Sequence, residues 1–303
     1  MARRPRWRLV LASVAFAAWA PPSLLGLPFA SLAFASGPRT QRERAVALAV
    51  GVASLVLLLA GDRGILDGFL GAYVVLVSAA FVALTLVAPA RFLQQAWRAS
   101  LLALVVALAL ARAVLGRQAG DMLRWEATRQ WTTMIGLAVS RRPEAFPFFV
   151  PAVQFLAETV PAMLVLQACA GLALAWQWHQ LVASDPLGEP LGPFREFRFA
   201  DAWVWGVVAG VGVWVTPLLA GLKIAALNLL VVLGAFYLLR GAAVAVVFAS
   251  AIGFSPAALA AGLVVAAVLA VPLLFIVPGL ATLGVSDTWL EFRRRLASRP
   301  NVS

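Results

Sequence analysis

The sequence is poor in the residues that form reactive centres. Its 303 residues include one cysteine, Cys169, and one histidine, His179. A single cysteine excludes a disulfide within the chain and a cysteine cluster that binds metal. One histidine cannot form a metal site or a catalytic triad alone, and the aromatic stretch 176–180 around it is typical of a membrane interface. We therefore expect no metal and no other cofactor.

The sequence motifs of common enzymes are absent too. The chain has no Walker lysine motif, no HExxH, no GxSxG and no GxGxxG, so the usual signals of nucleotide binding, zinc proteolysis and serine hydrolysis are missing. We predict that the protein is not an enzyme. An intramembrane enzyme that uses scattered Asp, Glu or Arg is the alternative.

Charge is scarce and unevenly placed. Only 12% of the residues are charged and 63% are hydrophobic, with a mean hydropathy of +0.93, which is far too apolar for an ordinary soluble domain. The net charge is +11, but most of the arginines lie in short loops and at the two ends. Positive-inside topology explains this better than a nucleic-acid surface does. The expected partner is the lipid bilayer, and no nucleic acid is expected.

Eight apolar runs predict an all-α bundle of about eight transmembrane helices. The runs cover residues 9–36, 45–60, 65–90, 99–115, 148–182, 202–220, 224–252 and 257–283. A crossing needs about 20 residues, so several of these helices must tilt, kink or protrude. With the N-terminus inside, the inner loops and ends collect 15 basic residues and the outer loops collect 7. This favours a bacterial cytoplasmic membrane protein with both termini in the cytoplasm.

The first apolar run carries two further interpretations. Four arginines precede it, a pattern shared by retained helices and by cleaved signal peptides. We favour one retained helix that is kinked at Pro21–Pro22. A re-entrant hairpin at these prolines would move every later loop to the other side and give 11 basic residues on each side. The cluster Arg39–Arg44, which eight spans place outside, keeps that alternative open.

The chain is expected to form a single integral membrane domain over residues 1–303. Within it, residues 1–115 hold the N-terminal helices, 116–147 an inner-surface segment and 148–303 the C-terminal helices. Helical spacing of apolar residues in the middle segment predicts an amphipathic helix near 119–138, with Trp125 and Trp131 at the membrane surface. A lid, or a docking surface for a cytoplasmic partner, is the alternative.

Four polar residues inside the apolar runs suggest a pocket. Gln154 and Glu158 are spaced four residues apart and share one helix face, while Asn228 and Arg240 lie in a later run. An unpartnered charge in the bilayer costs about 2.5 to 3.5 kcal/mol on insertion scales. We therefore hypothesise that Glu158 and Arg240 face each other across a substrate pocket that Gln154 and Asn228 also line. The alternative is that Arg240 reaches the interface along the helix.

The C-terminal part of the chain has a more specific pattern. LGPFREFRFADAWVWG at 191–206, ALNLLVVLGAFYLLRGAAVAVVF at 226–248 and LGVSDTWLEFRRRL at 283–296 resemble the YybS-like family of bacterial multipass membrane proteins, whose domain has no known function. The resemblance covers about the last 120 residues. Family members tend to carry glutamine where this chain has Arg240, which puts a substrate role for that charge in doubt.

The resemblance implies a function class. The YybS-like family is more distantly similar to the membrane-embedded substrate-binding subunits of energy-coupling-factor vitamin transporters, which bind a small molecule and dock on a coupling subunit that recruits ATPases. The implied function is a substrate-binding or transport-type membrane subunit without its own ATPase, with an unknown small-molecule ligand. The alternative is a structural or assembly component of a larger membrane complex.

The tail after the last run is expected to lie at the membrane surface. Asp287 and Thr288 can cap a helix there. The arginines Arg293, Arg294 and Arg295 would then meet lipid phosphates at the inner surface. Docking on a partner is the alternative.

Overall fold

The computed structural model describes residues 6–60, 64–88, 90–140, 144, 146–255, 258, 261–262, 265 and 273–292. These residues form helices, 3-10 turns and connecting segments, without a strand, and the all-α prediction is confirmed. The chain divides into two compact units, residues 1–191 and 192–303. The sequence-based subdivision began its C-terminal group of helices at residue 148, well before this boundary.

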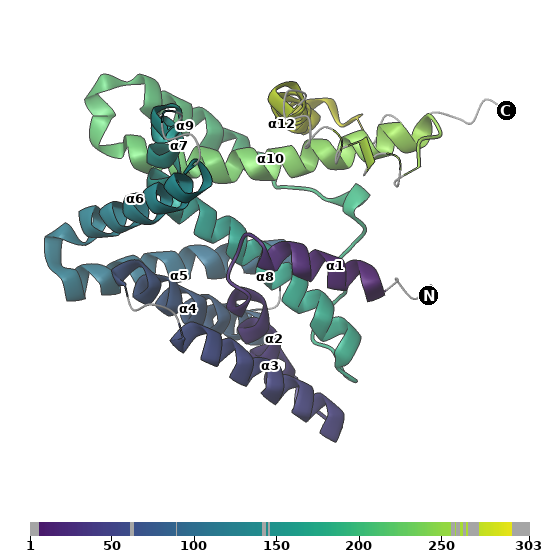
Figure 1. The fold of residues 1–303 in the computed structure, drawn as a ribbon. Coiled ribbons are helices and arrows are strands. Elements are labelled where there is room, and N and C mark those ends of the chain that lie inside the picture. The colour runs from purple at the N-terminus through teal and green to yellow at the C-terminus, as the bar shows by residue number, and fades with distance from the viewer. Residues whose placement is uncertain are drawn as a thin grey trace. The chain divides into compact units, whose positions relative to one another are not determined.

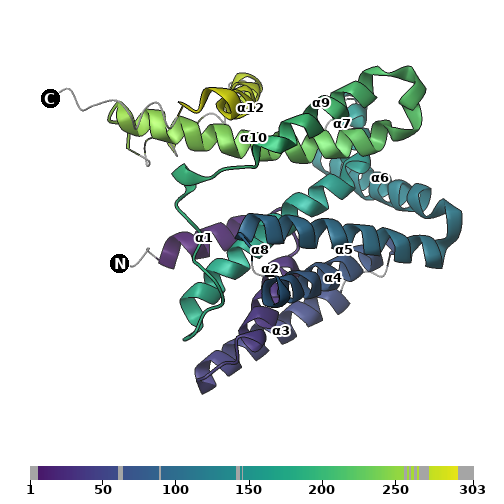
Figure 2. The ribbon, with the colours of Figure 1, turned by 180° about the vertical axis from the view of Figure 1, so that it is seen from behind.

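The described residues of unit 1 form eight α-helices. They are α1 (Arg6–Ala17), α2 (Ser23–Ala35), α3 (Gln41–Leu59), α4 (Ile65–Val87), α5 (Phe92–Leu115), α6 (Ala119–Ala138), α7 (Phe146–Glu158) and α8 (Val160–Val182) (Figure 1). Helix α8 is central to the packing because α1, α2, α5 and α7 all contact it. Helices α4 and α5 lie side by side (Figure 2).

A buried tyrosine ties the centre of unit 1 together. Tyr73 of α4 is fully buried, and its hydroxyl lies 3.5 Å from the carbonyl of Ser100 in α5 and 3.3 Å from that of Leu164 in α8. Further along α4, the Phe81 ring packs edge-on against Trp176 of α8. Helix α4 therefore runs in the same direction as α8.

Helix α1 runs along α8 in the opposite direction. In its second half, the Ser13 hydroxyl accepts a hydrogen bond of 2.9 Å from the Trp178 indole. Just after its end, the Trp19 carbonyl accepts one of 2.7 Å from the Gln167 amide. As the chain advances through α1, its contacts thus move back along α8 from residue 178 to residue 167.

Helix α2 then returns along α8. The Leu24 carbonyl lies so close to Gly171 that a side chain there would press against it. Five and nine residues further along α2, Phe29 and Ala33 line a hollow with His179. The contacts now advance along α8, so the chain reverses direction at the double proline.

This reversal differs from the single kinked span expected for residues 9–36. Helices α1 and α2 are each about 18 to 20 Å long by helical rise, and the hydrocarbon core is about 30 Å thick, so neither spans it alone. The arrangement has the geometry of the re-entrant alternative (Figure 1). Which side of the membrane each loop faces stays a prediction.

Four described helical stretches are long and apolar enough to cross a membrane. They are Ile65–Val87, Phe92–Ala138, Val160–Val182 and Pro217–Ala251. Helices α1, α2 and α7 and the stretches Asp201–Val215 and Phe275–Leu290 are apolar but shorter. Part of the run predicted at 257–283 lies outside the described residues, so the count of eight stays a prediction.

Helix α6 has the bounds predicted for the amphipathic helix. It follows the short turn η1 (Gly116–Gln118), where Gly116 has a positive φ of 75° that separates α5 from α6. A residue with a Cβ is strained in that conformation. Trp125 is 63% exposed within unit 1, which suits a side chain at a membrane surface.

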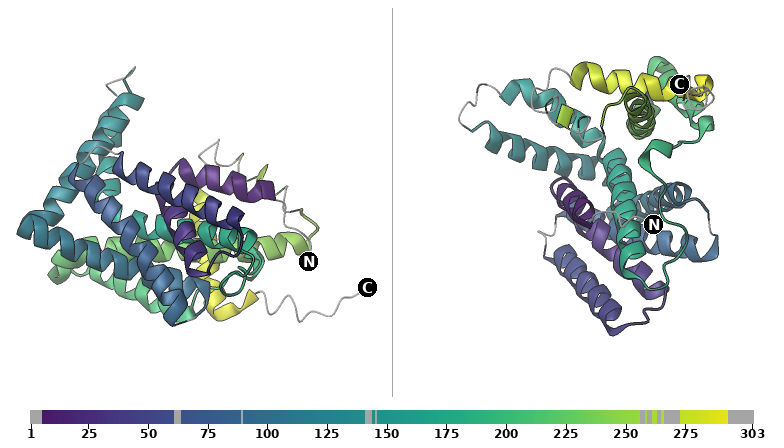
Figure 3. Two further views of the ribbon diagram at one scale, coloured as in Figure 1. Left: turned by 90° about the horizontal axis from the view of Figure 1, so that it is seen from below. Right: turned by 90° about the vertical axis from the view of Figure 1, so that its right-hand side faces the viewer.

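Unit 2 is built on one long helix. Its elements are η3 (Phe194–Glu196), η4 (Asp201–Trp203), α9 (Val204–Val215), η5 (Pro217–Leu222), α10 (Lys223–Ala251) and α12 (Leu273–Leu290). Helix α10 packs against α9 and, most extensively, against α12. In Figure 1 α12 points nearly toward the viewer while α10 lies flat, and the right panel of Figure 3 shows the reverse. The two helices therefore cross steeply.

Candidate functional site

The most highly charged buried cluster described in unit 2 is centred on Arg240 of α10. This side chain is 4% exposed. Its Nε donates to Asp287 Oδ2 of α12 at 3.0 Å, and its Nη1 donates to Asp201 Oδ1 at 2.5 Å and to the Phe199 carbonyl at 3.1 Å. The guanidinium thus joins α10 to α12 and to the segment that leads into η4.

The two carboxylates differ in their surroundings. The side chain of Asp287 is 3% exposed, whereas that of Asp201 is 65% exposed. The second oxygen of Asp287 accepts the Phe292 backbone N–H at 3.1 Å. A buried ion pair is stable only when its geometry is good and its remaining polar atoms are bonded. The Arg240–Asp287 pair has such bonds, so we interpret it as a structural tie.

Two glycines allow α10 and α12 to approach this closely. A Cβ on Gly241 would overlap the carbonyl oxygen of Leu280, and one on Gly284 would overlap that of Tyr237. The backbones are therefore in direct contact, one residue from Arg240. Small residues permit such close crossings between membrane helices.

The structure gives Arg240 partners that the sequence did not suggest. The expectation that it faces other helices fits its burial, but the partners found are Asp201 and Asp287. Asp287 lies inside α12 and not at the start of a surface helix, because α12 continues to Leu290. Both aspartates fall in the stretches 191–206 and 283–296, so the resemblance had contained the signal.

The remaining predicted pocket residues are spread over both units. Asn228 lies twelve residues before Arg240 on α10, about 18 Å along the axis, and its amide donates to the Ile224 carbonyl at 2.9 Å. Glu158 is the last residue of α7 and is half-buried, and Gln154 is exposed. A pocket that these residues share with Arg240 stays a prediction.

The predicted surface residues are placed in part. Trp125 stacks under the Arg129 guanidinium at 5.3 Å, and Trp131 is half-buried. Arg293, Arg294 and Arg295 lie outside the described residues.

A second polar centre lies at the C-terminal end of α8. Residues 183–191, here called the strap, fold back onto α8. The Trp176 indole donates to the Glu189 carbonyl at 3.0 Å, the Leu187 N–H donates to His179 Nε2 at 3.1 Å, and the Gln180 amide donates to the Leu187 carbonyl at 2.8 Å. Three side chains on one face of α8 thus bind the strap backbone.

Glu43, at the start of α3, holds the beginning of the strap. It is 8% exposed and accepts the Ser184 N–H at 3.1 Å, the Ser184 hydroxyl and the Arg39 N–H at 2.9 Å. Thr40 and Glu43 also form a capping box at the N-terminus of α3. Outside this contact, Arg39 and Asp185 form an exposed ion pair.

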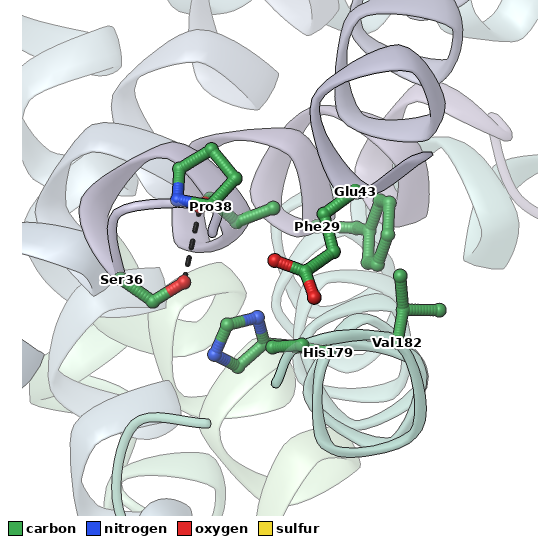
Figure 4. A pocket seen from close by; sticks show the side chains of 8 residues that line it. Phe29, Ser36, Pro38, Glu43, His179 and Val182 are labelled. Atoms are coloured by element: carbon green, nitrogen blue, oxygen red, sulfur yellow. Dashed lines mark hydrogen bonds between the residues drawn. The ribbon is translucent and has the colours of Figure 1, made fainter. Parts of the chain in front are cut away.

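Glu43 and His179 face a common hollow between α2, α3 and α8 (Figure 4). It has room for about one water molecule, so it is too small for an organic substrate. Sequence analysis took His179 as an interface residue and did not consider Glu43. The spacing of Thr40 and Glu43 is typical of a capping box and could have drawn attention to Glu43. Contacts to the strap backbone leave no pattern in the sequence that could have indicated them.

No group of three His, Cys, Asp or Glu side chains placed to hold a metal ion occurs in the described part of the chain.

Comparison with protein families gives one match: the family described as "Predicted membrane protein (DUF2232)" matches residues 10–288. No curated protein matches the chain. No solved structure matches it either.

Proposed function

The chain belongs to the DUF2232 family of predicted membrane proteins, and from this premise we propose that it is a substrate-binding or transport-type membrane subunit without its own ATPase. In this proposal it resides in the bacterial cytoplasmic membrane and binds a small molecule. A separate coupling subunit supplies the energy.

The observation that carries this proposal is the helix break at Pro21–Pro22. The break packs beside Gly171, the middle residue of α8, and Gln167 satisfies the Trp19 carbonyl that the break frees. Many membrane transporters place broken helices near the bilayer midplane, where the substrate binds. Irregular backbone at that depth must be buried in protein or line a water-filled cavity.

The ligand-binding residues proposed are Gln154 and Glu158 of unit 1. Glu158 lies at a second break, because Thr159 separates α7 from α8. The charge of Arg240 is neutralised by two carboxylates, so in this proposal Arg240 supports the fold of unit 2 and does not bind the ligand. In this proposal the exposed Trp125 meets lipid or the coupling subunit.

A thermal-stability screen of the purified full-length protein tests the proposal. A ligand that binds the native state raises the melting temperature by mass action. We expect a positively charged or hydrogen-bonding small molecule to do so, and the shift to disappear in Glu158→Gln. It should persist in Glu144→Gln, which alters an exposed carboxylate. A ligand shift that survives Glu158→Gln contradicts the proposed pocket.

A structural or assembly role is the second candidate. The Arg240 cluster favours it, because its polar atoms are consumed by contacts between helices. Co-purification distinguishes the two functions. An ATPase module that elutes with the protein supports transport, and retention in a larger assembly that lacks an ATPase supports the structural role.

A further inference from the structure

We propose that His179 is a proton-binding site whose protonation releases the strap, residues 183–191, from the end of α8. The proposal concerns unit 1 alone. It adds a pH-responsive element to the protein and does not depend on the proposed transport function.

The hydrogen bonds of His179 define its state in the closed structure. Its Nε2 accepts the Leu187 N–H at 3.1 Å, so Nε2 carries no proton and the neutral ring holds its proton on Nδ1. The ring is fully buried. Among the described residues nothing accepts a hydrogen bond from Nδ1. Figure 4 shows the ring turned toward the hollow that Glu43 also faces.

A second proton on the ring changes the contact with the strap. Protonation adds a hydrogen at Nε2, where the Leu187 N–H already points, and two donors then oppose each other. The contact must open, because neither N–H can accept. The proton comes from solvent, and no other bond forms or breaks.

The surroundings of His179 allow the charged ring to exist. Glu43, from α3, is the carboxylate that lines the hollow, and α2 contributes Phe29, Ala33 and Ser36. The strap's own Asp185 is paired outside the hollow with Arg39, and Glu189 contributes its carbonyl. Phe81 of α4 and Phe92 of α5 pack near this end through Trp176. A charged ring would therefore face the carboxylate of Glu43 across the hollow.

A spin label on the strap tests this proposal in the full-length protein. Glu189 has an exposed side chain, so Glu189→Cys can carry the label, with the buried Cys169 replaced by alanine. Histidine is the side chain that ordinarily titrates between about pH 5 and pH 8. On acidification across this range we expect the ratio of mobile to immobile label to rise about tenfold, the change that follows from losing one hydrogen bond.

Two variants and one control make the test specific. His179→Gln keeps an acceptor near Leu187 but has no proton to gain, so its label should stay immobile throughout. Glu43→Gln removes the compensating charge and should move the release to lower pH, which gives a readout even if the first variant does not fold. Asp185→Asn, which breaks only the exposed pair with Arg39, should keep the wild-type response.

Two results would overturn the proposal. The first is a wild-type spectrum that is unchanged by acidification across the range. The second is a His179→Gln protein whose label responds to acidification in the same way as the wild-type label. If His179→Gln does not fold, the same response in Glu43→Gln overturns the proposal.

Discussion

The Arg240 cluster and the His179 centre differ in whether the charge they carry is fixed. In unit 2 the permanent cation Arg240 is held by two aspartates and a backbone carbonyl. In unit 1 a neutral base, His179, accepts a backbone N–H beside a carboxylate. Arginine keeps its proton under all physiological conditions, so the first centre cannot respond to pH. Histidine exchanges its proton near neutrality, so the second centre can.

The difference shows how a position in the fold limits the use of a charge. The Arg240 cluster lies where two helices cross in backbone contact, and movement there would separate α10 from α12. The His179 centre binds a loop, which can leave without disturbing a helix crossing. The Arg240 cluster stabilises the helix bundle, whereas the His179 centre is placed where a change of protonation can release a loop.

The largest expected effect on stability comes from a substitution that separates α10 from α12 at the Arg240 cluster. Gly284→Ala places a methyl group on the Tyr237 carbonyl, forces α12 away from α10 and breaks the Arg240–Asp287 pair as well. We expect a loss of about 3 to 5 kcal/mol, seen as a greatly lowered melting temperature in detergent. Gly279→Ala on the same helix meets open space and should change little. Equal melting temperatures for the two variants would show that the crossing is not tight.

The next effect separates the two aspartates. Asp287→Asn removes the buried partner of Arg240, leaves only the exposed Asp201 carboxylate to pair with it, and should destabilise the protein by about 3 kcal/mol. Asp201→Asn removes an exposed carboxylate and should cost at most about 1 kcal/mol. The double variant Arg240→Gln with Asp287→Asn should be more stable than either single variant. If the stability losses of the two single variants, measured by thermal unfolding, add up in the double variant, the Arg240–Asp287 ion pair does not stabilise the fold.

A smaller effect concerns the helix break in unit 1. Gln167→Leu leaves the Trp19 carbonyl without its amide donor, and we expect a loss of about 0.6 to 2 kcal/mol, the usual range for hydrogen bonds between membrane helices. The exposed Gln94 provides the control, because Gln94→Leu should leave the melting temperature unchanged. If Gln167→Leu is equally silent, that hydrogen bond does not support the reversal at the double proline.

The limits of the sequence-based predictions follow from the physics of each feature. Local periodicity places α6 at Ala119–Ala138 because an amphipathic pattern needs only neighbouring residues. Two prolines predict that residues 9–36 break, but the direction in which α2 leaves depends on its contacts with α8.

The partners of the buried charges were harder to predict. The cost of burying Arg240 shows that it needs a partner, yet Asp201 and Asp287 lie 39 and 47 residues away along the chain. The crossing of α10 and α12 brings Asp287 to Arg240, and the packing of the segment around Phe199 against α10 brings Asp201. Most of the hydrogen bonds that hold the strap go to its backbone, which every sequence possesses, so no residue pattern indicates them.

Amide hydrogen exchange on the wild-type protein, read by mass spectrometry above and below the ordinary titration range of histidine, tests the contrast most directly. After correction for the intrinsic effect of pH on exchange, we predict that protection of the strap, residues 183–191, falls on acidification. Protection around Phe199, Asp201 and Arg240 should stay constant. Loss of protection in both regions, or in neither, would contradict the account.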